Sequence, residues 1–313
     1  MSAGLPTVTP ADTAAFLAAR FGTAISDVRP LGAGAWSRAY AFVRDGARWV
    51  IRWSDLDDNF ARDAFAARFA GDGLPIPPIT DLGRDRLGFF AISPFVDGSD
   101  YEELPAAQLS ELMPSLLAMF RALRRVDLSA TTGFGIWDGG GNGLSPSWHA
   151  FLLDDKDASE GSLIRGWRAR LAASPLGTGP YEALWRRFAP LVARCPNERR
   201  LIHSDLLNHN LLAGDGRITA VLDWGSSLYG DPLWDVAWFT YCEPWYPHFQ
   251  EIGLARRVLE DFRADPAADS TDIAARLRCY QLAIGLDSIR YNAWRRAWPD
   301  AREAAERALS LAR

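Results

Sequence analysis

A short hairpin pattern bounded by polar residues constrains the fold of this chain more than any other part of its sequence. Two apolar runs, 211–213 and 218–222, flank a Gly-Asp-Gly triplet that is typical of a tight turn between antiparallel strands. Counting outward from the turn places Asn210 and Asp223 near each other at the open end of the hairpin. We therefore expect an amide and a carboxylate to lie side by side on rigid strands.

These two side chains have the chemistry of a magnesium site. Amide and carboxylate oxygens are hard ligands, and such ligands suit Mg²⁺ bound to a triphosphate. Asp205 precedes Asn210 on the same loop, where its carboxylate can accept a proton from an incoming hydroxyl group. Phosphoryl transfer needs positioning and neutralisation of charge more than covalent chemistry. The pattern therefore predicts Mg²⁺-dependent phosphoryl transfer, with Asp205 as base and with Asn210 and Asp223 as metal ligands.

The first 96 residues have the pattern of a small lobe built on an antiparallel sheet. Thr9-Pro10-Ala11-Asp12 is typical of a capped helix start, and the helical run Thr13 to Phe21 follows it. The runs 39–43 and 48–53 flank an Asp-Gly turn and predict a β-hairpin. Further elements expected in this lobe are a helix over 59–70 and a buried strand over 87–96.

The sequence after Tyr101 changes to mainly helical periodicity, so we expect the chain to divide into residues 1–96 and 97–313. Asp97-Gly98 is a natural boundary between the two. The glycine-rich stretch Gly133 to Gly143 predicts a loop. The expected fold class is α+β, a small sheet lobe leading into a larger helical lobe. Helices in the second lobe are predicted over 106–126, 147–153, 162–173 and 181–193, with three or four more after Asp235.

The spacing of polar residues in the second lobe resembles that of a known family. The pattern His203-x-Asp205-x-x-x-x-Asn210 is followed by Asp223-Trp224 and then by Gly-Asp-Pro-x-x-Asp ending at Asp235. These elements are similar, in order and spacing, to those of the aminoglycoside phosphotransferase family, a relative of the protein kinases. The resemblance covers nearly the whole chain and implies a bilobal, protein-kinase-like fold. Four further segments resemble members of that family that act on hygromycin-type aminocyclitols: 74–77, 127–135, 216–221 and 284–287.

The resemblance implies a role for each matching position. Asp205 would be the catalytic base, and Asn210 and Asp223 would hold Mg²⁺ on ATP or GTP. His203 would support the loop, and the alternative is that it transfers protons. Taken alone, Gly32-Ala33-Gly34 is equally typical of an ordinary turn. The other implied positions are Gly32, Gly34 and Ser37 over the phosphates, Pro94 and Val96 against the nucleotide base, and His203, Asp231 and Asp235 as supports.

The chain departs from the family at the lysine that usually grips the nucleotide phosphates. Its single lysine is Lys156, far along the sequence, and Arg52 stands at the matching place on the predicted strand. A guanidinium can grip phosphate oxygens with two N–H groups, although its length and planarity differ from those of lysine. Asp63, on the following helix, is the nearest candidate for its partner. The alternative is that Arg52 is a surface residue and that the phosphates are held from elsewhere.

Candidate acceptor-binding residues lie in the helical lobe. Trp238 and Trp245 belong to an aromatic series with helical spacing, which is typical of a core but can also present rings for sugar stacking. Glu243 and Asp287 are carboxylates that can meet substrate ammonium groups, although each is equally typical of a solvated surface acid. The net charge of −5 is compatible with a cationic acceptor.

The resemblance and the charge together predict an antibiotic kinase acting on an aminoglycoside or aminocyclitol of the hygromycin type. A second interpretation keeps the fold and chemistry but changes the acceptor to a macrolide, a viomycin-type peptide, choline, homoserine or a sugar. A third is a catalytically inactive, kinase-like binding module, which the missing lysine favours and which Asp205, Asn210 and Asp223 oppose.

Composition excludes several other classes of protein. The negative net charge argues against a nucleic-acid partner, and no apolar run is long enough for a membrane span. The three cysteines are odd in number and widely spaced, which indicates neither a disulfide framework nor a zinc site. We therefore expect a cytoplasmic monomer.

Overall fold

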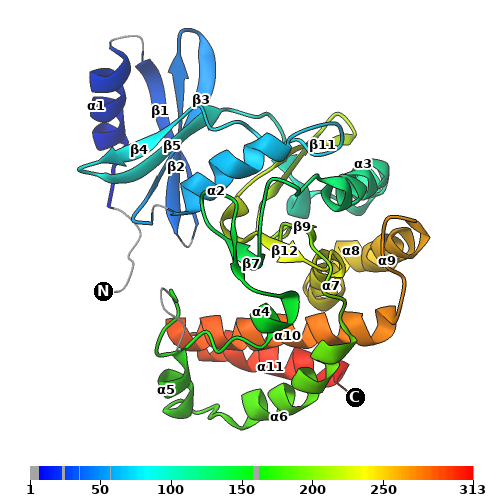
Figure 1. The fold of residues 1–313 in the computed structure, drawn as a ribbon. Helices are drawn as coiled ribbons and strands as arrows, with labels where there is room; N and C mark the ends of the chain where they lie inside the picture. The colour runs from blue at the N-terminus through cyan, green and yellow to red at the C-terminus, as the bar shows by residue number, and fades with distance from the viewer. Residues whose placement is uncertain (1–6, 23–24, 35, 57, 158–161, 313) are drawn as a thin grey trace.

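Two lobes of unequal size lie one above the other in the computed structural model, which describes residues 7–22, 25–34, 36–56, 58–157 and 162–312 (Figure 1). The small lobe contains a five-stranded antiparallel sheet in the order β1-β2-β3-β5-β4. Its strands are β1 (Ile25–Ala33), β2 (Ser37–Arg44), β3 (Ala47–Ser54), β4 (Asp81–Asp85) and β5 (Gly88–Pro94). This is the antiparallel lobe that the sequence predicts.

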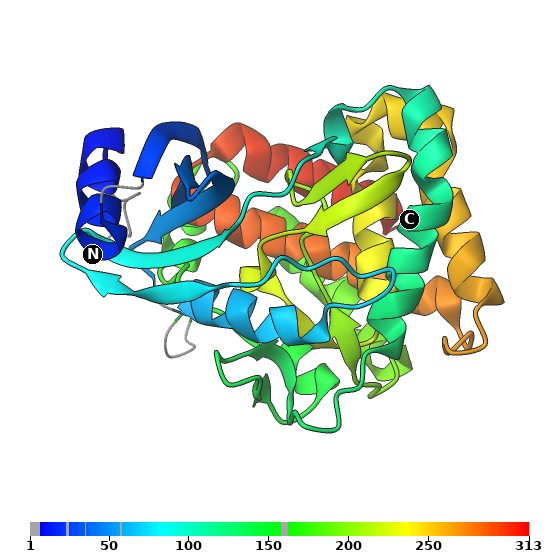
Figure 2. The ribbon, with the colours of Figure 1, turned by 90° about the horizontal axis from the view of Figure 1, so that it is seen from above.

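Helix α1 (Pro10–Phe21) packs beside this sheet, as the view from above also shows (Figures 1 and 2). The Thr9 hydroxyl accepts a hydrogen bond from the Asp12 N–H at 3.1 Å, and the Asp12 carboxylate accepts one from the Thr9 N–H at 3.0 Å. This reciprocal capping box confirms the predicted helix start. Leu17 is fully buried. The apolar core of the small lobe comprises Val8, Leu17, Tyr40, Phe42, Ile51, Trp53, Phe90 and Ile92.

The segment between β3 and β4 packs against the larger lobe. It contains helix α2 (Asp58–Ala66) and the 3₁₀ helix η1 (Ala67–Phe69), and its residues Ala66, Leu74 and Ile76 belong to the core of the large lobe. After β5 the chain crosses to β6 (Ser99–Asp100), which pairs with a strand of that lobe. The division at residue 96 stays a prediction, and part of the first 96 residues shares the larger core.

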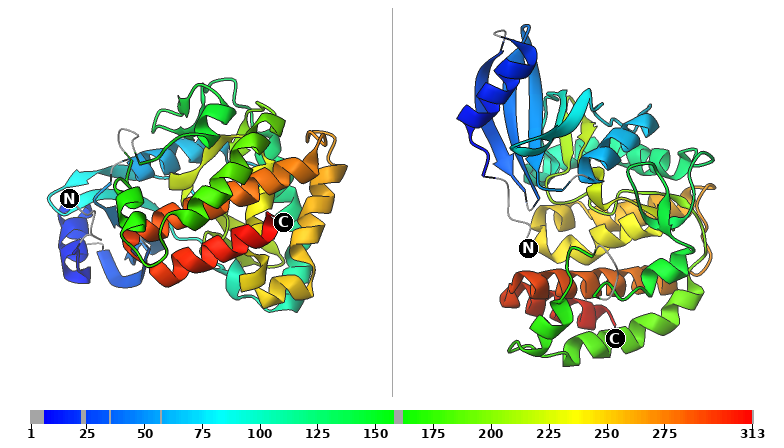
Figure 3. Two further views of the ribbon diagram at one scale, coloured as in Figure 1. Left: turned by 90° about the horizontal axis from the view of Figure 1, so that it is seen from below. Right: turned by 60° about the vertical axis from the view of Figure 1, so that its left-hand side comes forward.

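The large lobe is mainly helical and contains two small sheets, ordered β11-β10-β6 and β8-β7-β12-β9. Helices α10 and α11 lie side by side along its lower surface (Figure 3). The strands are β7 (Phe134–Trp137), β8 (Gly143–Ser145), β9 (Arg200–Ile202), β10 (Leu211–Gly214), β11 (Arg217–Val221) and β12 (Leu228–Gly230). The α-helices are α3 (Ala106–Arg125), α4 (Trp148–Leu152), α5 (Trp167–Ala172), α6 (Gly179–Phe188), α7 (Leu233–Cys242), α8 (Pro247–Glu251), α9 (Leu254–Ala264), α10 (Ile273–Arg295) and α11 (Trp298–Leu311). The 3₁₀ helices are η2 (Tyr101–Glu103), η3 (Ala189–Arg194), η4 (Trp224–Ser226) and η5 (Glu243–Trp245).

The prediction of a loop over Gly133 to Gly143 is wrong. The stretch contains β7 and the start of β8, which pair with each other, and β7 also pairs with β12. A Cβ atom at Gly133 would lie 2.1 Å from the Gly143 carbonyl oxygen. Glycine is therefore required for close approach of two strands here, rather than marking an irregular loop. The helix expected over 162–173 is also shorter, because α5 begins only at Trp167.

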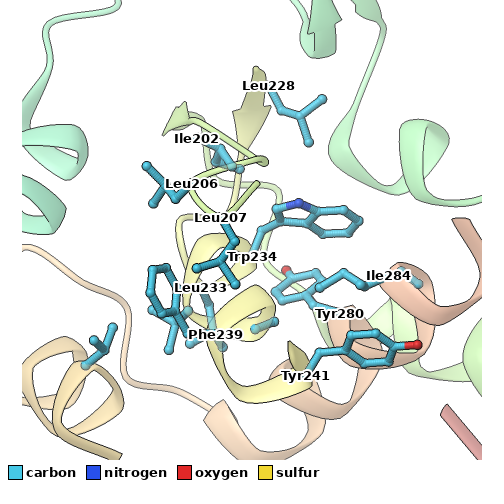
Figure 4. Close-up of a cluster of buried hydrophobic side chains, with 14 of the residues drawn as sticks. Ile202, Leu206, Leu207, Leu228, Leu233, Trp234, Phe239, Tyr241, Tyr280 and Ile284 are labelled. Atoms are coloured by element: carbon cyan, nitrogen blue, oxygen red, sulfur yellow. The ribbon is translucent and has the colours of Figure 1, made fainter. Parts of the chain in front are cut away.

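The predicted catalytic loop, residues 203–210, lies on a cluster of buried apolar side chains (Figure 4). Leu207 points from the loop toward side chains of α7 and α10, and Leu206, Trp234 and Tyr280 belong to the same cluster. All four are buried. No helix in the described part of the chain has the length and apolarity to cross a membrane.

Candidate active site

The backbone of the predicted catalytic loop is fixed by one carboxylate. Asp235, in the first turn of α7, accepts hydrogen bonds from the His203 N–H at 2.9 Å and from the Ser204 N–H at 2.7 Å. Asp235 is only 3% exposed, so these charge-assisted bonds form away from water. The Asp235 side chain thus sets the direction in which the chain enters the loop.

His203 is a fully buried link between the catalytic loop and the end of β11. Its Nε2 donates to the Leu222 carbonyl oxygen at 2.8 Å, and its Nδ1 accepts from the Asp205 N–H at 3.3 Å. These two bonds require the neutral Nε2–H tautomer, and burial lowers the pKa of His203 to about 4. The ring itself bonds to neither Asp231 nor Asp235, and the bond between His203 and Asp235 is made by the backbone N–H.

The Asp205 carboxylate is held by two asparagine side chains. Asn208 Nδ2 donates to Asp205 Oδ1 at 2.6 Å, and Asn210 Nδ2 lies 3.3 Å from Asp205 Oδ2. Burial raises the pKa of Asp205 to about 8, the two asparagine bonds oppose this shift, and the negative charges of Asp223 and Glu102 add to it. The carboxylate is therefore fixed in position and has the basicity of a proton acceptor.

Asn210 and Asp223 lie at the open end of the β10–β11 hairpin, where counting from the turn placed them. The Asn210 carbonyl oxygen accepts from the Leu222 N–H at 2.8 Å, directly before Asp223. The Asn210 amide nitrogen also donates to the Asp205 carbonyl oxygen at 2.7 Å, which turns the amide oxygen away from the loop. Asp223 has a left-handed backbone with φ of 57°, a strained conformation that is concentrated at functional sites. Both side chains therefore fit the predicted pair of oxygen ligands.

Arg52 and Asp63 form the ion pair that the sequence predicts. Asp63 Oδ1 also accepts from the Trp224 N–H at 2.7 Å, so the pair is tied to the backbone beside Asp223. The Arg52 side chain is 20% exposed and lies over the Phe60 ring at 5.1 Å. Burial opposes the charged guanidinium, but Asp63 and Asp223 raise the pKa of Arg52 above its ordinary value. Arg52 therefore faces the space between the lobes rather than open solvent.

That space is a cavity of about 380 Å³ with mainly apolar walls from both lobes. Four residues predicted to bind the nucleotide line it: Gly32, Arg52, Pro94 and Val96. Asp63 and Asp223 face the same cavity. Its other described lining residues are Leu31, Ala39, Val50, Ile76, Pro77, Ile79, Ser93, Phe95, Gly98, His209, Leu212, Val221, Leu222 and Trp224.

Gly34 and Ser37 lie at the tip of the β1–β2 hairpin, beyond this lining. The Gly34 N–H donates to the Ser37 carbonyl oxygen at 2.9 Å and holds the two strands together at the turn. Extra Cβ atoms at Gly32 and Gly34 would meet nothing within 4 Å. The glycines are therefore not demanded by packing within the chain, and their contact with phosphate stays a prediction.

Asp231 is a buried anchor between α7 and α10. Its carboxylate accepts from Arg276 Nη2 at 2.8 Å, from the Tyr280 hydroxyl at 2.6 Å and from the Leu233 N–H at 3.0 Å. Asp231 and Arg276 are both fully buried. These contacts hold the start of α7, on which Asp235 lies, against the helical lobe.

The four candidate acceptor-binding residues lie in different surroundings. Trp245 is 39% exposed, and its ring N–H donates to Glu303. Trp238 and Glu243 are half-buried. Asp287 lies 2.7 Å from both Lys156 Nζ and Arg290 Nη1, so its charge is already compensated.

Sequence reasoning missed a cluster beside the catalytic loop made of Asp100, Glu102 and His209. Glu102 is buried and accepts from the His209 N–H and from the Tyr246 hydroxyl, each at 2.6 Å. The Asp100 carboxylate contacts the ring of His209, so both acids contact the residue that directly precedes Asn210. The Asp100-Tyr101-Glu102 segment directly after the connector was the only signal in the sequence.

Comparison with known proteins agrees with this geometry. Residues 27–270 match the model of the phosphotransferase enzyme family. The chain belongs to this family. As a member of the phosphotransferase enzyme family it is an enzyme with a kinase-like fold, as the sequence predicts.

Relatives of this family member act on aminoglycosides. The chain is 30% identical over 290 residues to Hygromycin-B 4-O-kinase of Escherichia coli, a match covering 91% of this chain and 80% of that protein. It is similar to the crystal structure of aminoglycoside phosphotransferase APH(4)-Ia, with a TM-score of 0.85, 28% identity and coverage of 97% of this chain and 98% of that chain. A thermostable mutant of that enzyme in ternary complex with AMP-PNP and hygromycin B gives a TM-score of 0.82, 28% identity and coverage of 96% and 97%. Aminoglycoside 2'-phosphotransferase-IIIa with GDP, at 17% identity and TM-score 0.67 over 97% of both chains, shares the fold.

Proposed function

We propose that this enzyme transfers the terminal phosphoryl group of ATP or GTP to a hydroxyl group of hygromycin B or a closely related aminocyclitol. The observation that carries the chemistry is the position of the Asp205 carboxylate, fixed by Asn208 and Asn210 close to the negative charge of Asp223. The acceptor is proposed from the similarity to Hygromycin-B 4-O-kinase and to APH(4)-Ia bound to hygromycin B.

Asp205 would orient the acceptor hydroxyl and take its proton as the new P–O bond forms. A carboxylate held by side-chain amides needs no reorganisation at that moment, which lowers the barrier to transfer. Its pKa of about 8 gives it the basicity for this role. His203 would support the loop rather than move protons, because both of its ring nitrogens are already hydrogen-bonded.

The nucleotide would occupy the cavity between the lobes. Its apolar walls suit a flat base, and the backbone at Pro94 and Val96 would meet the edge of that base. Arg52 would grip the phosphates from β3, where Asp63 fixes the direction of its guanidinium.

Asn210 and Asp223 fit Mg²⁺ because an amide oxygen and a carboxylate on adjoining rigid segments are hard ligands. When bound, Mg²⁺ would neutralise charge on the phosphates. The chain contributes by fixing both side chains: the Asn210 amide nitrogen is bonded into the loop, and Asp223, which lines the cavity, has a left-handed backbone.

The proposed activity is tested by resistance and by direct phosphorylation. Cells expressing the chain should tolerate higher concentrations of hygromycin B, and the purified protein should phosphorylate hygromycin B in the presence of Mg²⁺ and ATP or GTP. The variant Asp205→Asn should abolish the gain in tolerance at an equal protein level. Mass spectrometry of the product would identify the modified hydroxyl group.

Other acceptors give a different outcome in the same assay. Transfer to a macrolide, a viomycin-type peptide or a small metabolite, with no transfer to aminocyclitols, would overturn the acceptor and leave the kinase chemistry in place. Absence of turnover with every acceptor, despite nucleotide binding, would favour the inactive binding module.

A further inference from the structure

An aromatic contact joins the small lobe to helix α10 of the large lobe. It starts from the tip of the β1–β2 hairpin, which carries Gly32, Gly34 and Ser37 and is called the phosphate loop below. The Trp36 ring stacks on Trp294, with ring centroids 5.7 Å apart and planes inclined by 29°. Tyr291 lies one turn earlier on α10, with its centroid 6.5 Å from Trp36 and 6.2 Å from Trp294. We call these three side chains the aromatic bridge. In Figure 1 the tip of the β1–β2 hairpin points down toward the left-hand, C-terminal end of α10.

Both ends of the aromatic bridge are held in place. The Trp36 carbonyl oxygen accepts from the hydroxyl of Ser54, a fully buried residue at the end of β3, at 2.9 Å. Arg170 of α5 donates to the Trp294 carbonyl oxygen, and Trp294 packs against the large core. The contact therefore joins two segments whose backbones are each hydrogen-bonded to their own lobe.

Trp36 does not belong to the described lining of the cavity proposed to hold the nucleotide. The described lining of the interlobe cavity includes Gly32 and Arg52 but not Trp36, whose ring faces α10 instead. Trp36 also lies outside the apolar core of its own lobe. Among the described residues, the ring contacts of Trp36 are with Tyr291 and Trp294 of the large lobe. The Gly34 N–H and the Ser37 carbonyl oxygen are hydrogen-bonded across the turn that carries Trp36.

We propose that Trp36 is a positioning residue. Through the aromatic bridge it sets the distance between the phosphate loop and the phosphates of a bound nucleotide. The inference rests on the proposed nucleotide site and names a residue that acts on it without touching the ligand. Loop contacts to phosphate depend on where the loop lies, so loss of the bridge would weaken binding of the terminal phosphates. The nucleoside end is held by the connector and would not change.

The test compares binding of a nucleoside triphosphate with binding of the matching monophosphate, in the presence of Mg²⁺ and without acceptor. Calorimetry on Trp36→Ala should show about 3- to 10-fold weaker binding of ATP or GTP, the range expected for loss of one aromatic pair. Binding of AMP or GMP should stay within about twofold of the wild type. Trp36→Phe, which keeps a ring, should recover most of the triphosphate affinity.

A variant of the partner ring on the large lobe distinguishes positioning by Trp36 from direct contact between Trp36 and the nucleotide. Trp294→Ala lies on α10 and should reproduce the loss seen with Trp36→Ala, and the double variant should be no weaker than either single one. Trp298→Ala is the matched control, because it removes a half-buried indole from the next helix, and no ring contact with Trp36 exists among the described residues.

Several outcomes would overturn the inference. Trp36→Ala could lose equal affinity for the triphosphate and the monophosphate, or change only the KM of the acceptor. Trp294→Ala could bind the triphosphate with wild-type affinity, or the affinity losses could add in the double variant. A wild-type chain that binds triphosphate but ignores hygromycin B overturns only the proposed acceptor, because these measurements contain none. A wild-type chain that binds no triphosphate overturns the nucleotide site and this inference together.

Discussion

The predicted catalytic loop, residues 203–210, and the predicted phosphate loop, which carries Gly32, Gly34 and Ser37, are held in place in different ways. His203 and Ser204 are buried, and their backbone N–H groups donate to Asp235 within the same lobe. Leu31 to Gly34 are exposed, and the loop tip is secured by the Gly34–Ser37 bond and by the contact of Trp36 with the other lobe. The groups proposed to carry the chemistry are therefore preorganised, whereas those proposed to hold the phosphates depend on contacts from outside.

Backbone conformation shows the same difference. Ser204, Asn208 and Asp223 are non-glycine residues with φ between 57° and 69°, a region that costs free energy unless the surroundings enforce it. In the predicted catalytic loop, hydrogen bonds supply that enforcement: the Ser204 N–H donates to Asp235 in a buried position, and the exposed Asn208 donates to Asp205. Gly32 and Gly34 have open space where a Cβ would lie. The two loops therefore differ: the predicted catalytic loop contains strained backbone, and the predicted phosphate loop leaves room for a ligand.

The largest expected effect tests the preorganised loop. Asp205→Asn should keep the fold and nucleotide binding but lower kcat by roughly 10²- to 10⁴-fold, because the amide cannot accept the acceptor proton. The measurement is steady-state phosphorylation of hygromycin B, with nucleotide affinity determined in parallel. Asp215→Asn is the matched control, since it makes the same chemical change at the exposed β10–β11 turn.

Activity of Asp205→Asn within a few-fold of the wild type would contradict the proposed chemical role of the catalytic loop. A lower kcat with unchanged nucleotide affinity would support that role, because the loss of rate then lies in the transfer step alone.

A smaller effect is expected from the phosphate-binding side. Arg52→Ala should weaken nucleotide use roughly 10- to 150-fold, which corresponds to about 1.5–3 kcal/mol for a lost charge-assisted contact. Arg52→Lys should be partly active, because a lysine can reach the same phosphates as a point charge. The readout is kcat/KM for the nucleotide, with Arg84→Ala, an exposed arginine of β4, as control. Wild-type kcat/KM in Arg52→Ala would remove Arg52 from the site.

Local patterns in the sequence predicted much of this site. Counting from the turn of the β10–β11 hairpin brought Asn210 and Asp223 near each other, although a bulge between Leu212 and Ala213 shifts the register by one residue. The capping residues Thr9 and Asp12 marked the start of α1 in the same way. Such features depend on neighbours within a few residues, where spacing alone determines geometry.

Contacts between distant segments could not be predicted in this way. From the sequence, the Asp287 carboxylate was a candidate partner for substrate ammonium groups. In the structure it forms an ion pair with Lys156, which is distant in the sequence. The Glu102–His209 bond likewise joins segments that only the folded chain brings together. The side-chain partners of a charge decide whether it can meet a substrate, and those partners are a property of tertiary packing.

The smallest expected effect concerns the stability of the preorganised loop as a function of pH. His203 is neutral in the folded state, where burial lowers its pKa to about 4, against about 6.5 in an unfolded chain. Below pH 6.5 the unfolded chain therefore binds a proton that the folded chain does not. Stability from this residue is fully present above pH 6.5 and is lost as the pH falls toward 4. Between pH 7 and pH 5 the loss is about 2 kcal/mol.

The variant His203→Gln isolates this contribution, because glutamine does not titrate and other groups lose or gain protons equally in both proteins. Urea unfolding should show the wild type more stable at pH 7, since glutamine cannot make both hydrogen bonds of the ring. The difference in unfolding free energy should then shrink by about 2 kcal/mol on going to pH 5. Between pH 7 and pH 9 it should stay constant, because the imidazole is neutral in both states. A difference that stays constant or widens toward pH 5 would show that His203 is charged in the fold. The catalytic loop would then be held by an ion pair, and its contrast with the phosphate loop would rest on charge rather than on burial.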